Sequence, residues 1–355
     1  MSVAQTFAAA ASVSFSCPSD FMIRLSEYLQ SYGSSFSAAG GSVEARDSAG
    51  HWRIERRGAG LHVAVSAHDA AGRQRLCDTA AFLIDHIAPG LVDRLQWEGL
   101  GQEGVLPANM HEAQLVSVRR LSPHLLRLRL RLRCAGLAAL MTGGMHFSLL
   151  LPPEGRAPVW PSLNAAGRTV WPAGADKLHR AVFTFVDFDP QDHSFTFDLF
   201  EHKGGPATHW AQTARAGAQV VIAGPGGGEM PDLAADGSTT LVMAGDETAL
   251  PAIRHILRNA PPDQRGFVLV ETGDPADRLI ADLPAGVTLH WLDRAQDEHL
   301  AHHLPHLPLP DARAPFQLWI AGEQGMIRAA RKLFLEEAAL PKTCCYLAGY
   351  WTAPK

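Results

Sequence analysis

The first part of the chain mixes two hydrophobic patterns. The run HWRIERRGAGLHVAVSA (51–67) alternates apolar and polar residues, which is typical of strands that bury one face. Segments 21–32 and 77–87 instead space their apolar residues as amphipathic helices do. The second of these helices is expected to bury Phe82, Leu83, Ile84 and Ile87. The pattern predicts a small α+β unit.

A series of short strands dominates the middle of the chain. In HLLRLRLRLRC (124–134) leucines alternate strictly with arginines, so that Leu126 to Leu132 face one side and Arg127 to Arg133 the other. Further strand patterns follow, separated by turn residues: FSLLLP, AVFTFVDF, FTFDLF and QVVIAG. Many short strands of this kind predict a small antiparallel barrel. The arginine row either contacts an anionic ligand or forms a solvated barrel face, and the solvated face is the commoner arrangement.

Strands and helices alternate in the last part. TTLVMAG, GFVLVET, TLHWL and FQLWIAG are strand patterns, whereas LPAIRHILRNA and QGMIRAARKLFLEEAAL are helical. Such alternation predicts βαβ units around a parallel sheet. At 355 residues the chain has room for two or three domains. We predict an α+β domain over 1–98, a glycine-rich linker over 99–110, an antiparallel β-barrel domain over 111–234 and an α/β domain over 235–355.

Composition and charge narrow the class of protein. With 46% hydrophobic residues the chain is expected to fold, and a net charge of −5 gives no reason to expect a nucleic-acid partner. No run of about 18 apolar residues exists, so no membrane insertion is expected. The five scattered cysteines favour a reducing cytoplasm. Neither the Cys344-Cys345 pair nor the histidines of AHHLPHLPLP (301–310), which indicates a surface loop, has the spacing of a metal site.

Two segments carry candidate chemistry. In FDLFEHKGGPATHWAQTARAG (197–217) a strand ends at His202, a Gly-Gly-Pro turn follows, and a helix begins near Ala207. Its free amides offer a site for a pyrophosphate, although a plain strand–turn–helix junction is equally compatible. In TLVMAGDETALPAIRHIL (240–257) a strand ends at Gly245. Asp246, Glu247 and Thr248 then meet the nicotinamide end of a dinucleotide, or Asp246 and Thr248 simply cap the next helix.

Two later segments repeat parts of this layout. LWIAGEQGMIRAARKLF (318–334) ends a strand at Gly322 and Glu323, at the same sheet edge as Gly245. The C-terminal AGYWTAPK places Tyr350 and Trp351 where they either stack on a ring or pin the tail. No nucleophile elbow, phosphate-binding P-loop, zinc-protease motif or paired-carboxylate motif is present in the sequence.

Together these motifs resemble the siderophore-interacting protein family, flavin-dependent ferric-siderophore reductases related to the ferredoxin–NADP reductases. The matching segments occur in the family's order over residues 111–355: HKGGPATHWA (202–211), AGPGGG (223–228), AGDETALPAI (244–253), HWLDR (290–294), LWIAGE (318–323) and AGYW (348–351). The N-terminal part resembles more loosely a domain of unknown function that precedes some members of the family.

The resemblance implies a barrel that binds FAD and an α/β domain that binds NAD(P)H. The implied cofactor-binding residues are Arg180, Phe183, Thr184, His202, Gly204, Gly205, Ala207, Thr208, Trp210, Gly245, Asp246, Glu247, Thr248, Glu323 and Trp351. The chain departs from the family in its flavin strand, where Phe183 replaces a tyrosine and Val186 stands where a second arginine is usual. These changes remove a hydroxyl and a charge-assisted contact, so weaker FAD binding is expected.

The implied reaction takes electrons from NAD(P)H through FAD to a ferric siderophore and releases Fe(II). It needs no catalytic acid, base or nucleophile from the chain. A cationic rim is expected near the flavin, and the row Arg127 to Arg133 is a candidate for it. A reductase for another acceptor and a non-catalytic siderophore-binding or sensor protein are the alternatives. The sequence leaves open the oligomeric state and the choice of NADH or NADPH, for which Arg278 and Arg294 are candidates.

Overall fold

The computed structural model describes residues 7–13, 17–31, 36–133, 136–142, 144–226, 230–234, 236–280, 283–311 and 314–353. Cys134 and the last glycines of AGPGGG lie outside these residues. The chain divides into two compact units. One comprises Met1–Glu112, Leu150–Arg180 and Val221–Pro225, and the other comprises Ala113–Leu149, Ala181–Val220 and Gly226–Lys355. None of the described helices is long and apolar enough to cross a membrane.

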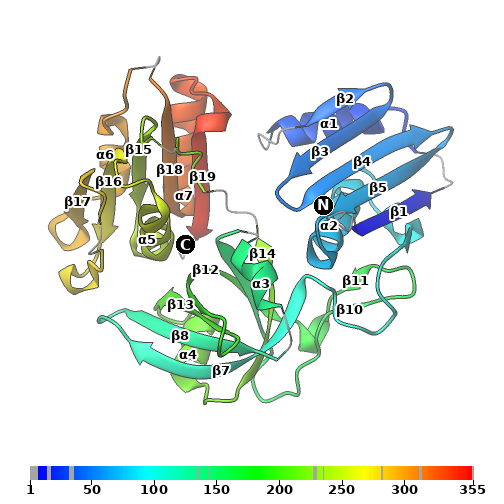
Figure 1. Ribbon diagram of the computed structural model, residues 1–355, viewed down its shortest axis with the longest axis horizontal. Helices are drawn as coiled ribbons and strands as arrows, with labels where there is room; N and C mark the ends of the chain where they lie inside the picture. The colour runs from blue at the N-terminus through cyan, green and yellow to red at the C-terminus, as the bar shows by residue number, and fades with distance from the viewer. Residues whose placement is uncertain are drawn as a thin grey trace. The chain divides into compact units, whose positions relative to one another are not determined.

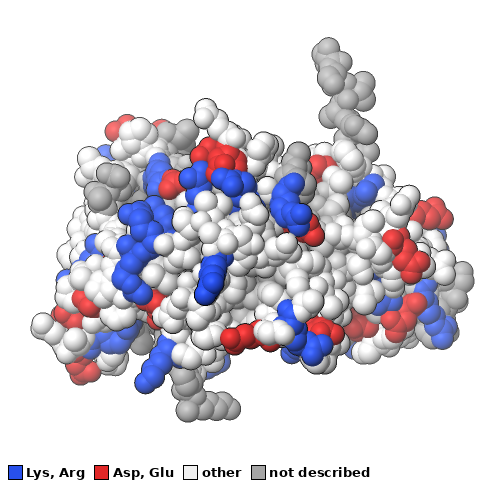
Figure 2. All heavy atoms as spheres, turned by 90° about the horizontal axis from the view of Figure 1, so that it is seen from below, with Lys and Arg blue, Asp and Glu red and all other residues white. Residues whose placement is uncertain are grey.

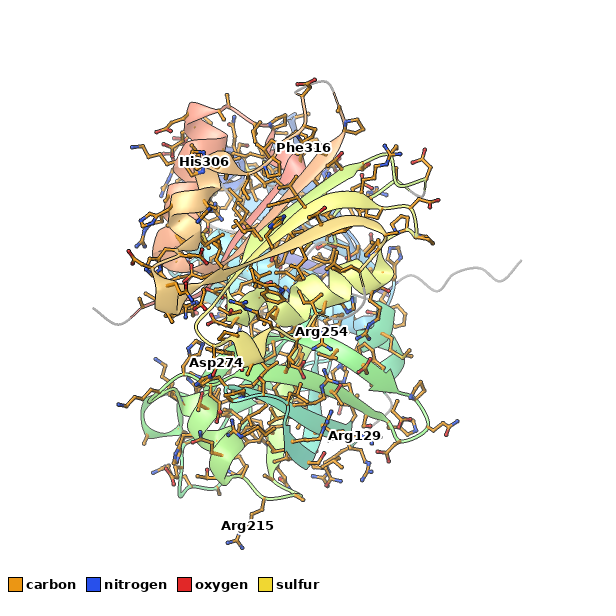
Figure 3. All side chains as sticks on the ribbon, turned by 90° about the vertical axis from the view of Figure 1, so that its left-hand side faces the viewer. Arg129, Arg215, Arg254, Asp274, His306 and Phe316 are labelled. Atoms are coloured by element: carbon orange, nitrogen blue, oxygen red, sulfur yellow. The ribbon has the colours of Figure 1, made fainter. Side chains whose placement is uncertain are left out.

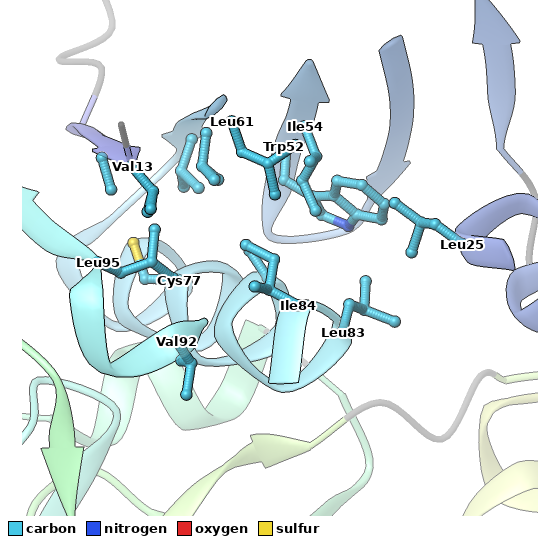
Figure 4. Packing of buried hydrophobic residues seen from close by; sticks show 14 of the residues in the cluster. Val13, Leu25, Trp52, Ile54, Leu61, Cys77, Leu83, Ile84, Val92 and Leu95 are labelled. Carbon is cyan, nitrogen blue, oxygen red and sulfur yellow. The ribbon is translucent and has the colours of Figure 1, made fainter. Parts of the chain in front are cut away.

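The N-terminal part forms an antiparallel sheet in the order β2-β3-β4-β5-β1-β6, drawn in blue and cyan in Figure 1. Its elements are β1 (Phe7–Val13), α1 (Phe21–Ser31), β2 (Ser37–Ala39), β3 (Ser42–Asp47), β4 (Gly50–Arg57), β5 (Gly60–Ala67), α2 (Ala70–Ile87) and β6 (Gln96–Glu98). Val13, Ile54 and Leu61 from the strands pack with Cys77 and Ile84 of α2 in one core (Figure 4). The α+β prediction is therefore confirmed.

The prediction that α2 buries Phe82 is wrong. The Phe82 side chain is 58% exposed, whereas Leu83, Ile84 and Ile87 are buried as expected. The buried residues of α2 recur every three or four positions from Leu76 onward, and position 82 falls outside that stripe.

The middle of the chain closes into the expected barrel, with strand order β12-β13-β8-β7-β14-β9. The strands are β7 (Met110–Arg120), β8 (Leu125–Leu132), β9 (His146–Leu151), β12 (His179–Asp189), β13 (Ser194–Phe200) and β14 (Gln219–Gly226). The short elements β10 (Ser162–Leu163), β11 (Thr169–Val170), α3 (Leu137–Thr142) and α4 (Pro206–Thr213) lie between them. The alternating leucines of β8 are all buried, which confirms the period-two pattern.

The arginine row on β8 is neither a simply solvated face nor an open anion site. Arg127 donates to Asp198 with Nε at 2.7 Å, and Arg129 pairs with Asp189 at 2.6 Å. Arg131 pairs with Asp192, also at 2.6 Å. On the face seen in Figure 2, Lys and Arg side chains lie beside Asp and Glu side chains. These three arginines are therefore neutralised by the barrel's own aspartates, and the expected cationic rim has to come from elsewhere.

The C-terminal part is a parallel sheet in the order β17-β16-β15-β18-β19, as predicted (Figure 1). Its strands are β15 (Thr240–Gly245), β16 (Arg265–Thr272), β17 (Gly286–Asp293), β18 (Phe316–Glu323) and β19 (Cys345–Trp351). Its helices are α5 (Leu250–Asn259), α6 (Leu300–His303) and α7 (Gln324–Arg331). The histidine-rich segment lies at the surface as expected, with His302 and His306 exposed, but it is not a loop throughout. It begins in α6 and a following turn, whose Leu300 and Leu304 are buried in the core.

The N-terminal sheet and the parallel sheet lie in the first and last predicted ranges, whereas β7 of the barrel already begins at Met110, in the predicted linker. The compact units divide the chain differently again, because part of the barrel groups with the N-terminal sheet. The domain boundaries stay a prediction. The segment 99–110 is tied by backbone hydrogen bonds, since the Gly104 N–H donates to the Leu163 carbonyl and the Leu163 N–H donates to Val105. It therefore has a fixed path within its unit.

Candidate functional site

The turn after β13 has the geometry of an anion-binding loop. Gly204 has a φ of +76°, a backbone angle that residues other than glycine rarely adopt. A Cβ built at this position would meet nothing within 4 Å. Gly205 is the N-cap of α4 and Pro206 occupies the first turn of that helix. The first amides of a helix, here those of Ala207 and Thr208, have no intrahelical acceptor. The turn thus presents unpartnered donors beside open space.

His202 and Thr208 fix the shape of this turn. The His202 N–H donates to Thr208 Oγ1 at 2.9 Å, and the Gly205 N–H donates to the His202 carbonyl at 2.9 Å. The Thr208 side chain is buried, whereas Trp210 is half-buried on the same helix. Burial lowers the pKa of His202, so the imidazole is neutral around pH 7.

The flavin strand predicted from the sequence is β12. Phe183 is half-buried, and its ring centroid lies 4.8 Å from that of Phe197 and 6.3 Å from that of Phe147. Thr184 is buried, whereas Val182 is exposed and Arg180 is exposed near the start of the strand. One face of Phe183 is therefore supported by the barrel core, and its remaining surface is free to contact a ligand.

Asp246 lies at the carboxyl edge of the parallel sheet, directly after β15. Its Oδ1 accepts hydrogen bonds from the Thr248 N–H at 2.9 Å and the Thr248 hydroxyl at 2.5 Å. Its Oδ2 accepts one from the Trp351 indole at 2.8 Å. Burial raises the pKa of Asp246. The Asp246 carboxyl group thus has two roles: it caps the turn that contains Thr248, and it binds the C-terminal Trp351.

Trp351 connects the sheet edge to the barrel turn. Its ring centroid lies 5.4 Å from that of His202, with the two planes inclined by 33°. The two chemistry-bearing segments of the sequence, 197–217 and 240–257, therefore meet at this indole, although they belong to different sheets.

Glu247 is committed to a buried network and does not face the sheet edge freely. Its carboxylate accepts Arg294 Nη1 at 2.9 Å, Arg294 Nη2 at 2.8 Å and the Gly273 N–H at 2.6 Å. Burial opposes the charge of Arg294, but hydrogen bonds to Glu247 and Glu271 outweigh this effect and raise its pKa. Glu247 thus links the end of β15 to Arg294 and Gly273. A direct contact between Glu247 and a nucleotide stays a prediction.

Glu323 is the N-cap of α7. It accepts hydrogen bonds from the Gly325 and Met326 N–H groups, and its other oxygen accepts the Ala353 N–H at 3.3 Å. Burial acts to raise the pKa of Glu323, but these backbone donors outweigh it and lower the pKa. The side chain therefore also holds the segment that follows Trp351.

The comparisons with known proteins agree with this geometry. Residues 114–229 match the model of the siderophore-interacting FAD-binding domain, and residues 238–354 match the model of the siderophore-interacting protein. The chain belongs to the siderophore-interacting protein family. The first match spans β7 to β14 and includes the turn with Gly204, so this part is an FAD-binding domain. The predictions of family, flavoprotein class and fold are confirmed.

Individual relatives are 22% to 28% identical to this chain over the aligned residues. The ferric vibriobactin reductase ViuB of Vibrio cholerae is 27% identical over 219 residues, which are 60% of this chain and 78% of the relative. The siderophore-interacting protein SipS from Aeromonas hydrophila is 28% identical with a TM-score of 0.56, over 69% of this chain and 92% of that structure. A siderophore-interacting protein from Acinetobacter baumannii, 22% identical, has a TM-score of 0.54 over 68% of this chain and 90% of that structure.

The residues present fit FAD. A pyrophosphate needs backbone donors that a side chain does not obstruct, and Gly204 and the first turn of α4 provide them. An isoalloxazine needs a flat apolar support, which Phe183 provides. At position 186, where the family usually has arginine, the valine is buried, and its carbonyl accepts Arg258 Nη1 of α5 at 3.3 Å.

Sequence reasoning missed a cluster of ionic contacts between α5 and the barrel. Asp198 on β13 is buried and accepts hydrogen bonds from Arg127 and from Arg254, the latter at 3.2 Å. Arg258 pairs with Asp187 at 2.7 Å. Figure 3 shows Arg254 at the side of α5 toward the barrel strands. The partners are 56 and 71 positions apart in the chain, so no local pattern indicates the pairing.

A second contact between barrel and sheet uses Asp277. This buried carboxylate accepts the Ser122 hydroxyl at 2.6 Å, the His124 N–H at 3.1 Å and lies 2.8 Å from His124 Nδ1. His124, Asp274 and Asp277 are the one group of side chains in the described ranges with metal-ligand spacing. Because donors from the barrel already bind both oxygens of Asp277, we infer that this carboxylate joins the barrel to the parallel sheet rather than binding a metal ion. Within the same ranges His302, His303 and His306 form no such group.

Proposed function

We propose that this protein transfers electrons from NAD(P)H through FAD to a ferric siderophore and so releases Fe(II). The observation that supports it most is the meeting of the FAD-domain turn, the carboxyl edge of the parallel sheet and Trp351 at one place. An open parallel sheet binds nucleotides outside the carboxyl ends of its strands, so a nicotinamide bound there would lie beside an FAD held by the barrel.

The barrel residues hold the FAD in this proposal. The free amides of Ala207 and Thr208, in the first turn of α4, bind the pyrophosphate beside Gly204, and Phe183 supports the ring. FAD held by these residues would supply an acceptor for the nicotinamide hydride and a donor of single electrons. Because Val186 supplies no guanidinium, we expect weaker binding than a second arginine would give.

The sheet edge orients the nicotinamide. Glycine is required at position 245 by close packing at the end of β15, because a Cβ there would lie 2.6 Å from Ala249 Cβ and 2.9 Å from the Ala321 carbonyl oxygen. Asp246 holds the Trp351 indole in place through its hydrogen bond. Asp246 is thus a positioning residue, and none of the chain's side chains has to exchange a proton with the substrate.

The ferric siderophore is the proposed electron acceptor, a class suggested by the named reaction of the ViuB relative. Hard anionic oxygens bind Fe(II) more weakly than Fe(III), so reduction releases the metal. One NAD(P)H yields NAD(P)⁺, a proton and two electrons, which reduce two ferric ions. A cytoplasmic location fits this reaction, and the described cysteines Cys17, Cys77, Cys344 and Cys345 are free thiols.

The apolar residues at positions 183 and 186 favour a second candidate, a siderophore-binding protein without turnover. Purified protein reconstituted with FAD separates the two when it is mixed with NADH or NADPH, a ferric chelate and a ferrous trap. The proposal predicts a ferrous signal that requires both nucleotide and FAD. Chelate binding without that signal would instead support the binding protein.

A further inference from the structure

We propose that the parallel sheet takes NADH in preference to NADPH, because Asp293 faces the adenosine ribose and the arginines beside it are already paired. This inference rests on the proposed function, since it names which nucleotide supplies the electrons. Three observations support the inference: the order of the strands in the sheet, the place of Asp293, and the contacts of Arg278 and Arg294.

Sheet order fixes the direction of the nucleotide. From β15 the chain continues outward to β16 and β17 on one side, and then crosses to β18 and β19 on the other. The crevice for a dinucleotide lies at this reversal, at the carboxyl ends of β15 and β18. Trp351, at the end of β19, contacts His202 of the FAD domain, so the nicotinamide lies toward that side. The adenosine half must then extend toward the ends of β16 and β17.

Asp293 ends β17 and is paired in register with Thr272, the last residue of β16. Its Oδ1 accepts the Ala295 N–H at 2.9 Å, which holds the carboxylate at the sheet edge. In doubly wound folds an acid at the end of the second strand accepts hydrogen bonds from the ribose hydroxyls of NAD, whereas a 2′-phosphate requires a basic group. Asp293 ends the third strand, in register with the end of the second. Asp293 is therefore placed for a ribose with a free 2′-hydroxyl.

The basic groups at this edge already have partners, which are acids for Arg294 and His299 and both a hydroxyl and Asp293 for Arg278. Arg294 donates Nη1 and Nη2 to Glu247 and Nε to Glu271. Arg278 donates to Thr272 Oγ1 at 3.2 Å and lies 3.7 Å from Asp293 Oδ2. His299 lies between two acids, with its Nδ1 3.6 Å from Glu271 Oε1 and its Nε2 3.2 Å from Asp297 Oδ1.

Further acids surround the same edge. Glu298 accepts the Asp293 N–H at 2.9 Å, and Asp274 begins the turn after β16. A 2′-phosphate, which adds nearly two negative charges, would have to displace one of the engaged arginines and face Asp293. Juxtaposed like charges disfavour a ligand strongly, so we expect NAD⁺ to bind ~10-fold or more tightly than NADP⁺.

Calorimetric titration of the FAD-loaded protein with NAD⁺ and with NADP⁺ tests this inference without turnover. The oxidised nucleotides are the probes, because they bind and leave the flavin oxidised. The variant Asp293→Ser keeps an N-cap oxygen for Ala295 while it removes the charge. We expect this variant to reduce the preference for NAD⁺ several-fold. Asp69→Ser is the matched control, since Asp69 caps α2 in the same way, and it should leave the ratio unchanged.

The outcomes are distinguishable. Binding of NADP⁺ that is as tight as that of NAD⁺, or tighter, overturns the inference. A ratio of the two affinities that is the same in Asp293→Ser and in the wild type also overturns it. Both results leave the proposed reductase intact. A protein that binds neither nucleotide overturns both the inference and the proposed electron donor. Circular dichroism of Asp293→Ser shows whether the variant is folded, and the wild-type ratio tests the inference independently of it.

Discussion

Replacement of Asp198 by asparagine should destabilise the protein strongly, because Asp198 is a fully buried anion shared by two cations. Its Oδ1 accepts Arg127 Nε at 2.7 Å, and its Oδ2 accepts Arg127 Nη2 at 2.8 Å and Arg254 Nη1 at 3.2 Å. Asparagine keeps the shape of the side chain and removes the charge. Arg127 and Arg254 would then be left largely buried and repelling one another.

The size of the effect follows from burial. The Asp198 carboxylate is 0% exposed, and the side chains of Arg127 and Arg254 are 19% and 24% exposed. Loss of one partner from a buried ion pair costs about 3–5 kcal/mol. For a unit of this size each 1 kcal/mol lowers Tm by ~2–4 °C, so we expect a fall of about 6–20 °C. The hydrogen bonds to Asp198 raise the pKa of Arg127, whereas burial lowers that of Arg254, so Arg127 is the tighter partner.

Urea unfolding followed by circular dichroism measures the effect, with Asp187→Asn as the matched control. Asp187 pairs with Arg258 at 2.7 Å and lies 3.8 Å from Arg127, but its side chain is 53% exposed. Exposed pairs contribute about 0–1 kcal/mol, so the control should differ little from the wild type. Equal losses in the two variants would refute the argument from burial.

Three further changes test the site. Gly204→Ala should lower stability by about 1 kcal/mol because of its φ of +76°, and should weaken FAD binding measured by absorbance. Gly58→Ala, at a φ of +61° in a hairpin of the N-terminal sheet, should lower stability alone. Burial raises the pKa of Asp246, so the native state keeps this proton to a higher pH than the unfolded chain. The urea stability of the wild type relative to Asp246→Asn should therefore fall as pH rises above about 4; a rise would contradict it. Trp351→Phe removes the indole donor to Asp246 and should cost about 1–2 kcal/mol, measured by urea unfolding; an unchanged midpoint would show that this hydrogen bond contributes little.

The sequence predicted those features that local periodicity encodes. The leucines of β8 are buried because a strand turns alternate side chains to one face, and the register with β13 keeps them there. Two glycines near strand ends also have local reasons. Gly204 has a positive φ, and Gly245 lies too close to Ala249 and Ala321 to carry a side chain. Fold class and candidate segments followed from such signals.

Partners across long separations did not follow from periodicity. No local signal shows whether the arginines of β8 face solvent or pair with aspartates, because strand pairing supplies the partners. Asp198 lies on β13, Asp189 ends β12 and Asp192 lies in the turn between these strands. Glu247 was placed at the nicotinamide end, yet Arg294 binds it across 47 positions. For these arginines and for Glu247, a partner far away in the chain decided the outcome.

Anaerobic absorbance spectroscopy of the FAD-loaded protein tests the central claim most directly. We predict that NADH bleaches the flavin absorbance and that a ferric siderophore, added next, restores it with the release of about two Fe(II) for each NADH consumed. Bleaching without recovery would point to another acceptor. Flavin absorbance unchanged by NADH and by NADPH, in protein shown to hold FAD, would contradict the account.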